Sequence, residues 1–200
     1  MTDLKRRVVL QMQISIDGFV EAASGERWQV WDWSADRAWD PALQRHFNEG
    51  YARADSVLLS RPMAQGGFID HWRRVAIARA DDPDFAFARR VGEIEKVILT
   101  SHPFSPMWER TRVIDGDRRA AVEALKSRPG GDILVFGGVR FARSLLDFDL
   151  VDELQLFVNP TAVGAGESLF SGTPTRPMRL LGSKGYDCGI GVNRYAPARA

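Results

Sequence analysis

The sequence predicts an α/β fold in which a mostly parallel, helix-covered sheet carries antiparallel strands at its C-terminal edge. Three observations lead to this prediction. Short runs of β-forming residues alternate with segments of helical periodicity along most of the 200 residues, which is typical of parallel sheets. The last runs follow one another with only turns between them. No linker, repeat or low-complexity tract interrupts the chain, so a single domain is expected over residues 1–200.

Each predicted strand ends at a turn or a polar signal. Strands are expected at 8–16, 55–60, 96–100, 112–114, 132–136, 152–159, 178–186 and 191–195, the last two as an antiparallel pair. Helices are expected at 35–52, 117–127 and 139–146. Apolar side chains spaced by four support the first helix, although Pro41 lies within its early turns. Residues 61–93 are interpreted as loop and short helices around a site.

Composition excludes several classes of function. The chain is 44% hydrophobic and 26% charged with a net charge of +1, which fits a soluble globular protein and gives no reason to expect a nucleic-acid partner. A single cysteine forms no internal disulfide, and the three scattered histidines lack metal-ligand spacing, so no metal site is expected. No signal peptide or membrane span is found, so a cytoplasmic protein is expected.

The most informative segment is the strand at 132–136, which stops at Gly137 and Gly138 before a helix that carries Arg140. Such a turn directs unpaired backbone N–H groups and the positive end of a helix dipole at one point, which suits a phosphate. Glycine also lets an anion approach the backbone closely. The alternative is an ordinary strand-to-helix turn.

Other predicted strands also end in polar residues, and ligands of such sheets bind at the carboxyl ends of strands. Arg61 follows Ser60, and Thr100 and Ser101 offer hydroxyl groups. Together these residues suggest an elongated, phosphate-bearing ligand. A dinucleotide fits this description, although the chain has no G-x-G-x-x-G motif after its first strand and no P-loop.

Five segments resemble the dihydrofolate reductase superfamily, in particular the branch of the reductase domain of bacterial riboflavin biosynthesis and its stand-alone relatives. They are Ser-Ile-Asp-Gly-Phe-Val at 15–20, Ala-Asp-Ser-Val-Leu-Leu-Ser-Arg at 54–61, Lys-Val-Ile-Leu-Thr-Ser at 96–101, Gly-Asp-Ile-Leu-Val-Phe-Gly-Gly at 131–138, and Leu-Val-Asp-Glu-Leu at 150–154 followed by Pro160, Gly164, Gly166, Leu169 and Phe170. They span nearly the whole chain in the order of the family. The resemblance implies a three-layer fold of dihydrofolate reductase type that binds NADPH.

The resemblance also implies roles for the residues that match the motifs of the family. The pyrophosphate would lie at Gly137, Gly138 and the helix start formed by Val139, Arg140 and Phe141. The adenosine side, with the extra phosphate of NADPH, would lie at Ser60, Arg61, Thr100 and Ser101. The nicotinamide would lie beside Ile16, Asp17 and Gly18, and the ring or the substrate near Met12 and Gln13. A homodimer is implied as well, with residues 152–159 and 178–195 as a candidate interface.

Residues 31–39 resemble the start of the substrate-side helix of dihydrofolate reductases. An acidic residue at the position of Asp36 there contacts the pterin and helps to protonate it, so Asp36 and Asp17 are the candidate catalytic residues. Trp31 and Trp33 either stack on a flat substrate or pack the loop. The alternative for Asp36 is a residue of the first helical turn, favoured there by the helix dipole.

One departure from the family concerns the second strand. The family commonly has Gly-Arg-x-Thr after it, whereas this chain has Ser60, Arg61, Pro62 and Met63, which removes one hydroxyl group and one backbone donor. The preference for NADPH over NADH therefore stays open. With this resemblance we expect an NADPH-dependent reductase of a small heterocycle, whose substrate is a pyrimidine of riboflavin synthesis, a dihydropterin or neither of these. The main alternative is a non-catalytic nucleotide-binding or regulatory protein that kept the fold; a hydrolase is a weaker one, because no nucleophile elbow is present.

Overall fold

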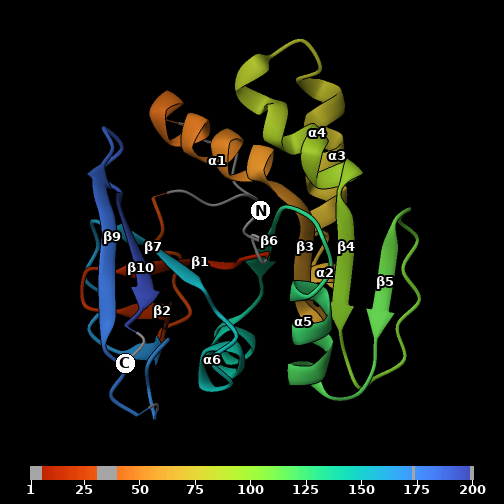
Figure 1. The fold of residues 1–200 in the computed structure, drawn as a ribbon. Coiled ribbons are helices and arrows are strands. Elements are labelled where there is room, and N and C mark those ends of the chain that lie inside the picture. Colours follow the sequence, from red (N-terminus) through yellow and green to blue (C-terminus); the bar gives the residue numbers. More distant parts are fainter. Residues whose placement is uncertain (1–5, 31–39, 173, 199–200) are drawn as a thin grey trace. The chain divides into compact units, whose positions relative to one another are not determined.

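The computed structural model describes residues 6–30, 40–172 and 174–198, which fall into two compact units. The first unit comprises Met1–Val8 and Pro41–Gly138, and the second comprises Val9–Asp40 and Val139–Ala200. Figure 1 labels the elements of both units. Each unit is described below by itself.

Four parallel strands form the sheet of the first unit. In spatial order they are β5 (Thr111–Ile114), β4 (Glu95–Leu99), β3 (Ala54–Ser60) and β6 (Asp132–Phe136). The middle residues of β3, β4 and β6 are almost completely buried, and they form continuous apolar runs instead of alternating with polar residues. This pattern is expected for parallel strands with both faces covered.

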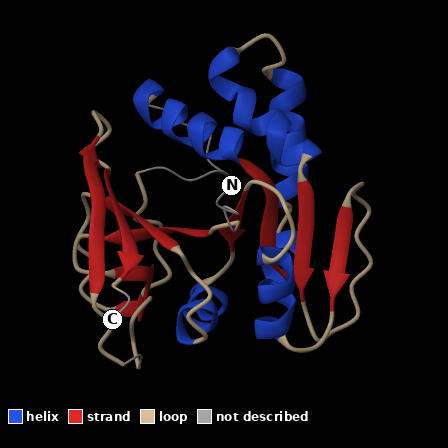
Figure 2. Ribbon diagram, viewed as in Figure 1, coloured by secondary structure: helices blue, strands red, loops and turns tan. Residues whose placement is uncertain are grey.

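The helices of the first unit include three that pack together through aromatic side chains. The helices are α1 (Pro41–Arg53), α2 (Arg61–Gln65), α3 (Phe68–Ala78), a 3₁₀ turn η1 (Pro83–Phe85), α4 (Ala86–Glu93) and α5 (Arg118–Lys126). Phe87 of α4 contacts Phe47 of α1 and Trp72 of α3, with ring centroids 5.9 and 4.8 Å apart. Figure 2 shows α1, α3 and α4 grouped together, apart from α5.

The second unit combines a parallel strand pair with antiparallel strands. Its elements are β1 (Val8–Ser15), β2 (Phe19–Ala22), α6 (Val139–Asp147), β7 (Glu153–Asn159), β8 (Gly166–Ser168), β9 (Met178–Gly185) and β10 (Gly191–Pro197). β1 is parallel to β7, whereas β10 is antiparallel to both β7 and β9. The expected final antiparallel pair is therefore confirmed.

The fold class is confirmed as α/β, with mostly parallel strands and antiparallel strands at the C-terminal edge. The short helices expected within residues 61–93 are confirmed as α2, α3, η1 and α4. Two details differ from the prediction. Asp40 is not helical, because the residue before a proline is disfavoured in a helix, and α1 begins at Pro41, which fits a first helical turn. The short antiparallel pair of β2 and β8 was not predicted.

Among the described residues, no helix is both long enough and apolar enough to cross a lipid bilayer.

Candidate functional site

Three segments predicted as ligand-binding follow three neighbouring strands of the first unit. β3 lies between β4 and β6, and all three strands run in the same direction. In the register, Ser60 pairs with Leu99 and Leu59 pairs with Phe136. The residues that follow these strands are therefore brought to one edge of the sheet: Ser60 and Arg61, Thr100 and Ser101, and Gly137 and Gly138. Parallel α/β sheets bind ligands at this carboxyl edge.

Arg61 offers an uncommitted guanidinium at this edge. The Ser60 hydroxyl caps α2 by accepting a hydrogen bond from the Met63 N–H at 3.3 Å, and Pro62 lies in the first turn. Two of the first three positions of the helix therefore have no free amide donor, because proline has none and that of Met63 is taken. Arg61 is half-buried, and its side chain has no hydrogen bond or ion pair within the described part of the chain.

Thr100 has its hydrogen-bonding groups occupied, whereas Ser101 is exposed. The Thr100 N–H donates to the Ile114 carbonyl at 3.1 Å, and its hydroxyl accepts from the His102 N–H at 3.0 Å. This local turn fixes the chain just after β4 and leaves the Ser101 hydroxyl facing solvent. Of the two predicted hydroxyl groups, the one on Ser101 is therefore the one available to a ligand.

The turn after β6 leaves its backbone open. Gly138 is exposed, and a Cβ placed on it would meet no atom within 4 Å. α6 begins at the next residue, its first turn contains no acidic side chain, and Val139 and Phe141 are buried while Arg140 is exposed. The first turn of α6 thus carries one arginine and no carboxylate, and the first N–H groups of a helix have no partner within the helix itself. These features fit the pyrophosphate of a dinucleotide.

Asp17 in the second unit ties two loops together. Its carboxylate accepts hydrogen bonds from the Ser15 hydroxyl at 2.5 Å, the Gly164 N–H at 2.7 Å and the Val163 N–H at 3.0 Å. These contacts, led by that of Ser15, lower the pKa of Asp17 to about 2. The carboxylate is therefore ionised at neutral pH and does not suit a proton donor. Its geometry makes it an anchor between the turn after β1 and the loop after β7.

The turn anchored by Asp17 exposes an apolar side chain. Gly18 has a φ of 87°, which a residue with a Cβ adopts only with strain, and its N–H donates to the Ser15 carbonyl at 3.0 Å. Ile16 donates its N–H to the Thr161 carbonyl at 3.0 Å, while 62% of the residue is exposed. An exposed isoleucine held on a fixed turn offers a flat ring an apolar contact.

Met12 and Gln13 lie on opposite faces of β1, because successive side chains of a strand alternate. Met12 is buried in the core. The Gln13 side chain accepts a hydrogen bond from Asn159 at 3.2 Å, and the Asn159 carbonyl oxygen in turn accepts from the Val30 N–H at 2.8 Å. Of the two side chains, only that of Gln13 has groups that can hydrogen-bond a ligand. Three predicted residues, Trp31, Trp33 and Asp36, lie outside the described residues.

A row of buried polar side chains beside Gln13 was missed by the sequence analysis. Gln11 donates to Gln155 at 2.9 Å, Gln155 donates to Glu153 at 2.7 Å, and Arg194 pairs with Glu153 at 2.7 Å. The side-chain oxygen of Gln11 is buried and has no partner within the described part of the chain. The available signal was the alternation of Gln11, Gln13 and Ser15 along the first strand, which places these polar side chains on one face.

The fold defined by these elements is that of dihydrofolate reductases. The dihydrofolate reductase of Enterococcus faecalis, solved in complex with NADP(H), superposes with a TM-score of 0.57 at 12% identity, over 96% of this chain and 97% of that chain. Within this fold, the model of the RibD C-terminal domain family matches residues 6–192. The chain belongs to this family.

The chain is also similar to individual proteins. Protein YyaP of Bacillus subtilis is 25% identical over 93% of this chain and 92% of its own length. The deaminase/5-amino-6-(5-phosphoribosylamino)uracil reductase of Thermotoga maritima superposes with a TM-score of 0.64 at 16% identity, over 97% of this chain. This chain spans only 57% of that bifunctional protein.

Proposed function

We propose that the protein is an NADPH-dependent reductase that transfers hydride to a small heterocycle, either a pyrimidine of the 5-amino-6-(5-phosphoribosylamino)uracil type or a pterin. Membership in the RibD C-terminal domain family and the likeness to two reductases support an oxidoreductase. One observation carries the choice of cofactor. Three adjacent strand ends of the first unit present an open glycine turn, an exposed serine and an arginine that has no hydrogen bond or ion pair among the described residues. The nicotinamide supplies the hydride when the cofactor is bound.

Different residues of the first unit would bind the pyrophosphate and the extra phosphate of NADPH. Gly138 and the helix start that follows it in the chain would hold the pyrophosphate through backbone N–H groups. Arg61 would pair with the extra phosphate that distinguishes NADPH from NADH. Because Pro62 and the Ser60 cap remove amide donors from the first turn of α2, the Arg61 side chain would provide most of that interaction.

The residues of the second unit would serve the nicotinamide and the substrate. Asp17 would keep the turn at 15–18 in place, so that Ile16 presents its apolar side chain to a ring. Gln13 would hydrogen-bond a polar edge of the substrate. Asp36 stays the proposed carboxylate that orients or protonates the substrate, and Trp31 and Trp33 the proposed stacking residues.

Titration with NADPH and, separately, with NADH tests the cofactor, with quenching of tryptophan fluorescence as the signal. We expect tighter binding of NADPH, and at least a tenfold loss in Gly138→Asp because a carboxylate would repel the phosphates. Gly92→Asp on α4 is the matched control, since a Cβ at Gly92 meets only the Arg73 side chain at 3.6 Å, an ordinary van der Waals contact. Binding of neither nucleotide to the wild-type protein would refute the proposal.

Turnover then separates an enzyme from a non-catalytic nucleotide-binding protein. Ser60, Pro62 and Met63 favour testing this alternative, because they replace a family motif that binds phosphate. NADPH oxidation is measured with 5-amino-6-(5-phosphoribosylamino)uracil and with dihydropterins. Oxidation with one class identifies the substrate type. Tight NADPH binding without oxidation by either class would favour the non-catalytic alternative.

The homodimer also enters here as a proposal. β9 is an edge strand of its sheet, and it exposes 55% of Leu180 and 36% of Leu181. An edge strand with exposed leucines suits pairing with a second copy of the chain. Light scattering coupled to size exclusion should report a mass of twice 22.4 kDa. Leu180→Lys should lower that mass to the monomer value if β9 forms the interface.

A further inference from the structure

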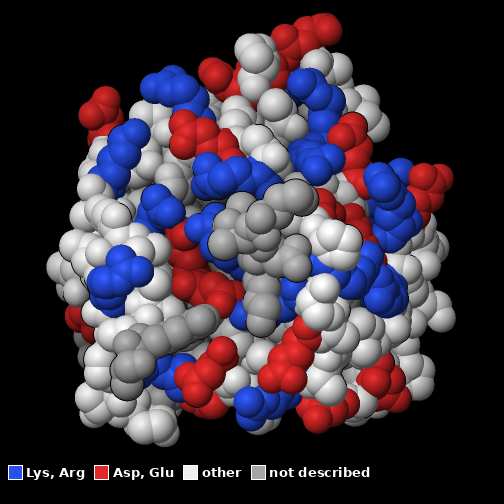
Figure 3. Space-filling view, in the orientation of Figure 1, with Lys and Arg blue, Asp and Glu red and all other residues white. Residues whose placement is uncertain are grey.

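The first unit contains a second polar site, at the end of the sheet opposite to Ser60 and Thr100. A cavity of about 670 Å³ lies where β3, β4 and β5 begin. Five arginines and two carboxylates line it, so it carries an excess of three positive charges. Figure 3 shows basic side chains on the surface over the upper ends of β4 and β5. The charged lining residues are Arg6, Arg90, Arg110, Arg112, Arg128, Asp55 and Glu95.

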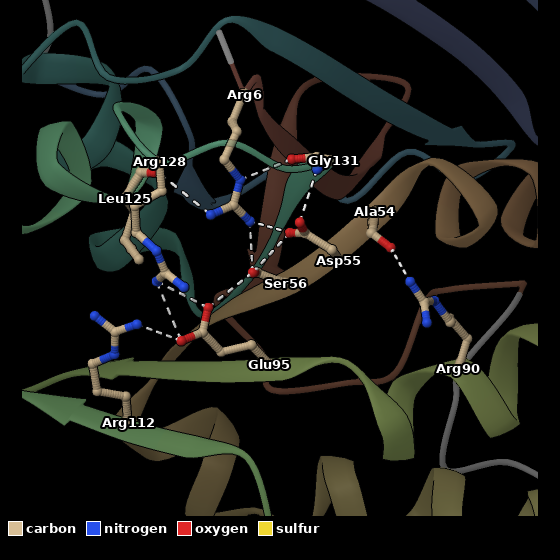
Figure 4. Close-up of polar contacts among 10 residues, drawn as sticks. All are labelled: Arg6, Ala54, Asp55, Ser56, Arg90, Glu95, Arg112, Leu125, Arg128 and Gly131. Atoms are coloured by element: carbon tan, nitrogen blue, oxygen red, sulfur yellow. Dashed lines mark hydrogen bonds and ion pairs between the residues drawn. The ribbon is translucent and has the colours of Figure 1, made fainter.

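Arg6 forms the fixed floor of this cavity. The residue is 3% exposed and donates hydrogen bonds to the Gly131 carbonyl at 3.0 Å, the Leu125 carbonyl at 3.3 Å and the Ser56 hydroxyl at 2.6 Å, besides its ion pair with Asp55. Asp55 also accepts from the Gly131 N–H at 2.8 Å. Figure 4 shows these contacts around the guanidinium group of Arg6. The charge of Asp55 is therefore already matched by Arg6.

Glu95 is the second carboxylate, and two arginines share it. Arg112 contacts its carboxylate at 2.5 Å and Arg128 at 3.2 Å (Figure 4). Partial burial alone would raise the pKa of Glu95, but the hydrogen bonds and charges of Arg112 and Arg128 lower it below its usual value. One carboxylate thus faces two guanidinium groups, which leaves one positive charge unmatched.

Arg90 and Arg110 bring two more unmatched charges. Arg90 donates to the Ala54 carbonyl and Arg110 to the Glu93 carbonyl, each at 2.9 Å. Neither guanidinium contacts a carboxylate within the described part of the chain. Each has five N–H donors in a planar fork, of which the described contacts use one nitrogen. Like charges around one cavity repel one another unless an anion lies between them.

We propose that this cavity binds a small, highly polar anion of the phosphate class, such as pyrophosphate or a sugar phosphate. A dianionic or trianionic group matches the excess charge, and arginine forks bind phosphate oxygens in pairs. The cavity volume lies in the range of small-molecule sites, so it has room for more than one phosphate group. Ile94 and Pro129 are the main apolar residues of the lining, which gives an aromatic ring little to stack on.

Isothermal titration calorimetry with pyrophosphate tests the site in chloride buffer at constant ionic strength. We expect saturable binding to the wild-type protein. Arg110→Gln should weaken it by roughly tenfold, because it removes a charge-assisted contact while only one carbonyl bond is lost. Arg112→Lys keeps the charge but loses the fork, so an intermediate loss is expected. Arg119→Gln is the matched control on α5, where the arginine pairs with Glu123 outside the cavity.

Three outcomes would overturn the proposal. They are no saturable heat with millimolar pyrophosphate, an equal loss in Arg110→Gln and Arg119→Gln, and displacement of pyrophosphate by saturating NADPH. The last would assign the binding to the carboxyl ends of the strands, and Gly138→Asp would then abolish it as well. A failure of the protein to bind NADPH would refute the proposed reductase but would leave the comparison of these variants unaffected.

Discussion

The two ends of the parallel strands in the first unit differ in how their polar groups are used. At the amino ends, side chains of opposite charge join neighbouring segments: Arg6 with Asp55, Arg112 with Glu95, and Arg7 with Asp132. At the carboxyl ends, Arg61 has no partner in the described part of the chain, and the backbone at Gly138 is open. Ion pairs thus join neighbouring segments at the amino ends, where Arg90 and Arg110 still lack a carboxylate partner in the described part of the chain, whereas Arg61 and Gly138 at the carboxyl ends take no part in such pairing.

The largest effect is expected from Arg6→Ala, which removes the central cation of the amino ends. The variant leaves Asp55 partly buried without its cation and leaves two carbonyl groups without their donor. We expect the free energy of unfolding to fall by about 2–4 kcal/mol, because two carbonyl groups and the partly exposed Asp55 each lose a donor. Urea denaturation followed by circular dichroism measures the change.

Arg119→Ala is the control for this experiment. Arg119 forms an exposed i,i+4 pair with Glu123, so its loss should cost about 0.5 kcal/mol or less. At a temperature where the Arg6→Ala variant is still folded, that variant should bind NADPH with the same affinity as the wild-type protein. If Arg6→Ala lowered NADPH affinity more than it lowered the free energy of unfolding, the amino ends would also contribute to NADPH binding, which would contradict the comparison.

Arg61→Ala is expected to act on binding and hardly on stability. Because the arginine has no partner in the described residues, its removal leaves no buried group unpaired. NADPH affinity should fall about 10- to 100-fold, the value of a charge-assisted phosphate contact. NADH affinity should stay nearly unchanged, since NADH lacks that phosphate. An equal loss for both nucleotides would show that Arg61 shapes the site instead of reading the extra phosphate.

The pKa of Lys96 offers a test of the repulsion between positive charges at the amino ends of the strands. The residue is 1% exposed, and burial, followed by repulsion from Arg73 and Arg110, lowers its pKa to about 8. Between this value and the usual 10.5 of an unfolded chain, the unfolded state binds more protons. The free energy of unfolding should therefore rise as the pH increases from about 8, by on the order of 1 kcal/mol up to about pH 9.5.

Lys96→Met should remove most of this rise, and urea denaturation at several pH values compares the two proteins. The range stops below pH 10 because burial raises the pKa of Tyr51, which makes stability fall once tyrosines ionise in the unfolded chain. An equal rise in both proteins would assign the pH dependence to another group.

The carboxyl ends were predictable from sequence, and the amino ends were not. Ser60 with Arg61, and Gly137 with Gly138, are local signals: each pair follows an apolar run directly, and parallel strands end at a common edge. The partners of Arg6 instead come from residues 49 and 125 positions away. Their meeting depends on the strand order, which alternation of strands and helices does not specify.

The role of Asp17 shows the same limit at a single residue. Sequence reasoning assigned it to the candidate site from its turn after the first strand, but its partners Val163 and Gly164 lie in a loop 146 and 147 positions away. The short helices at 61–93 were expected, but their packing was not, since the aromatic contacts of α4 also involve α1. Local pattern gives strand ends and turns, whereas long-range contacts decide what each side chain does there.

The smallest effect is expected at Asp17, a carboxylate held by the Ser15 hydroxyl and by backbone N–H groups and not by arginine. Its pKa is lowered to about 2, so its contribution to stability is present above the usual 3.8 and is lost as the pH falls toward 2. Asp17→Asn should lack this loss, and denaturation midpoints at about pH 5 and about pH 3 compare the two proteins. High salt should weaken the pairing of Glu95 with Arg112 but not the hydrogen bonds of Asp17, because neutral dipoles are not screened as exposed ion pairs are. An acid loss in wild type that disappears in high salt would mean that distant charges, and not the loop at 163–164, stabilise ionised Asp17.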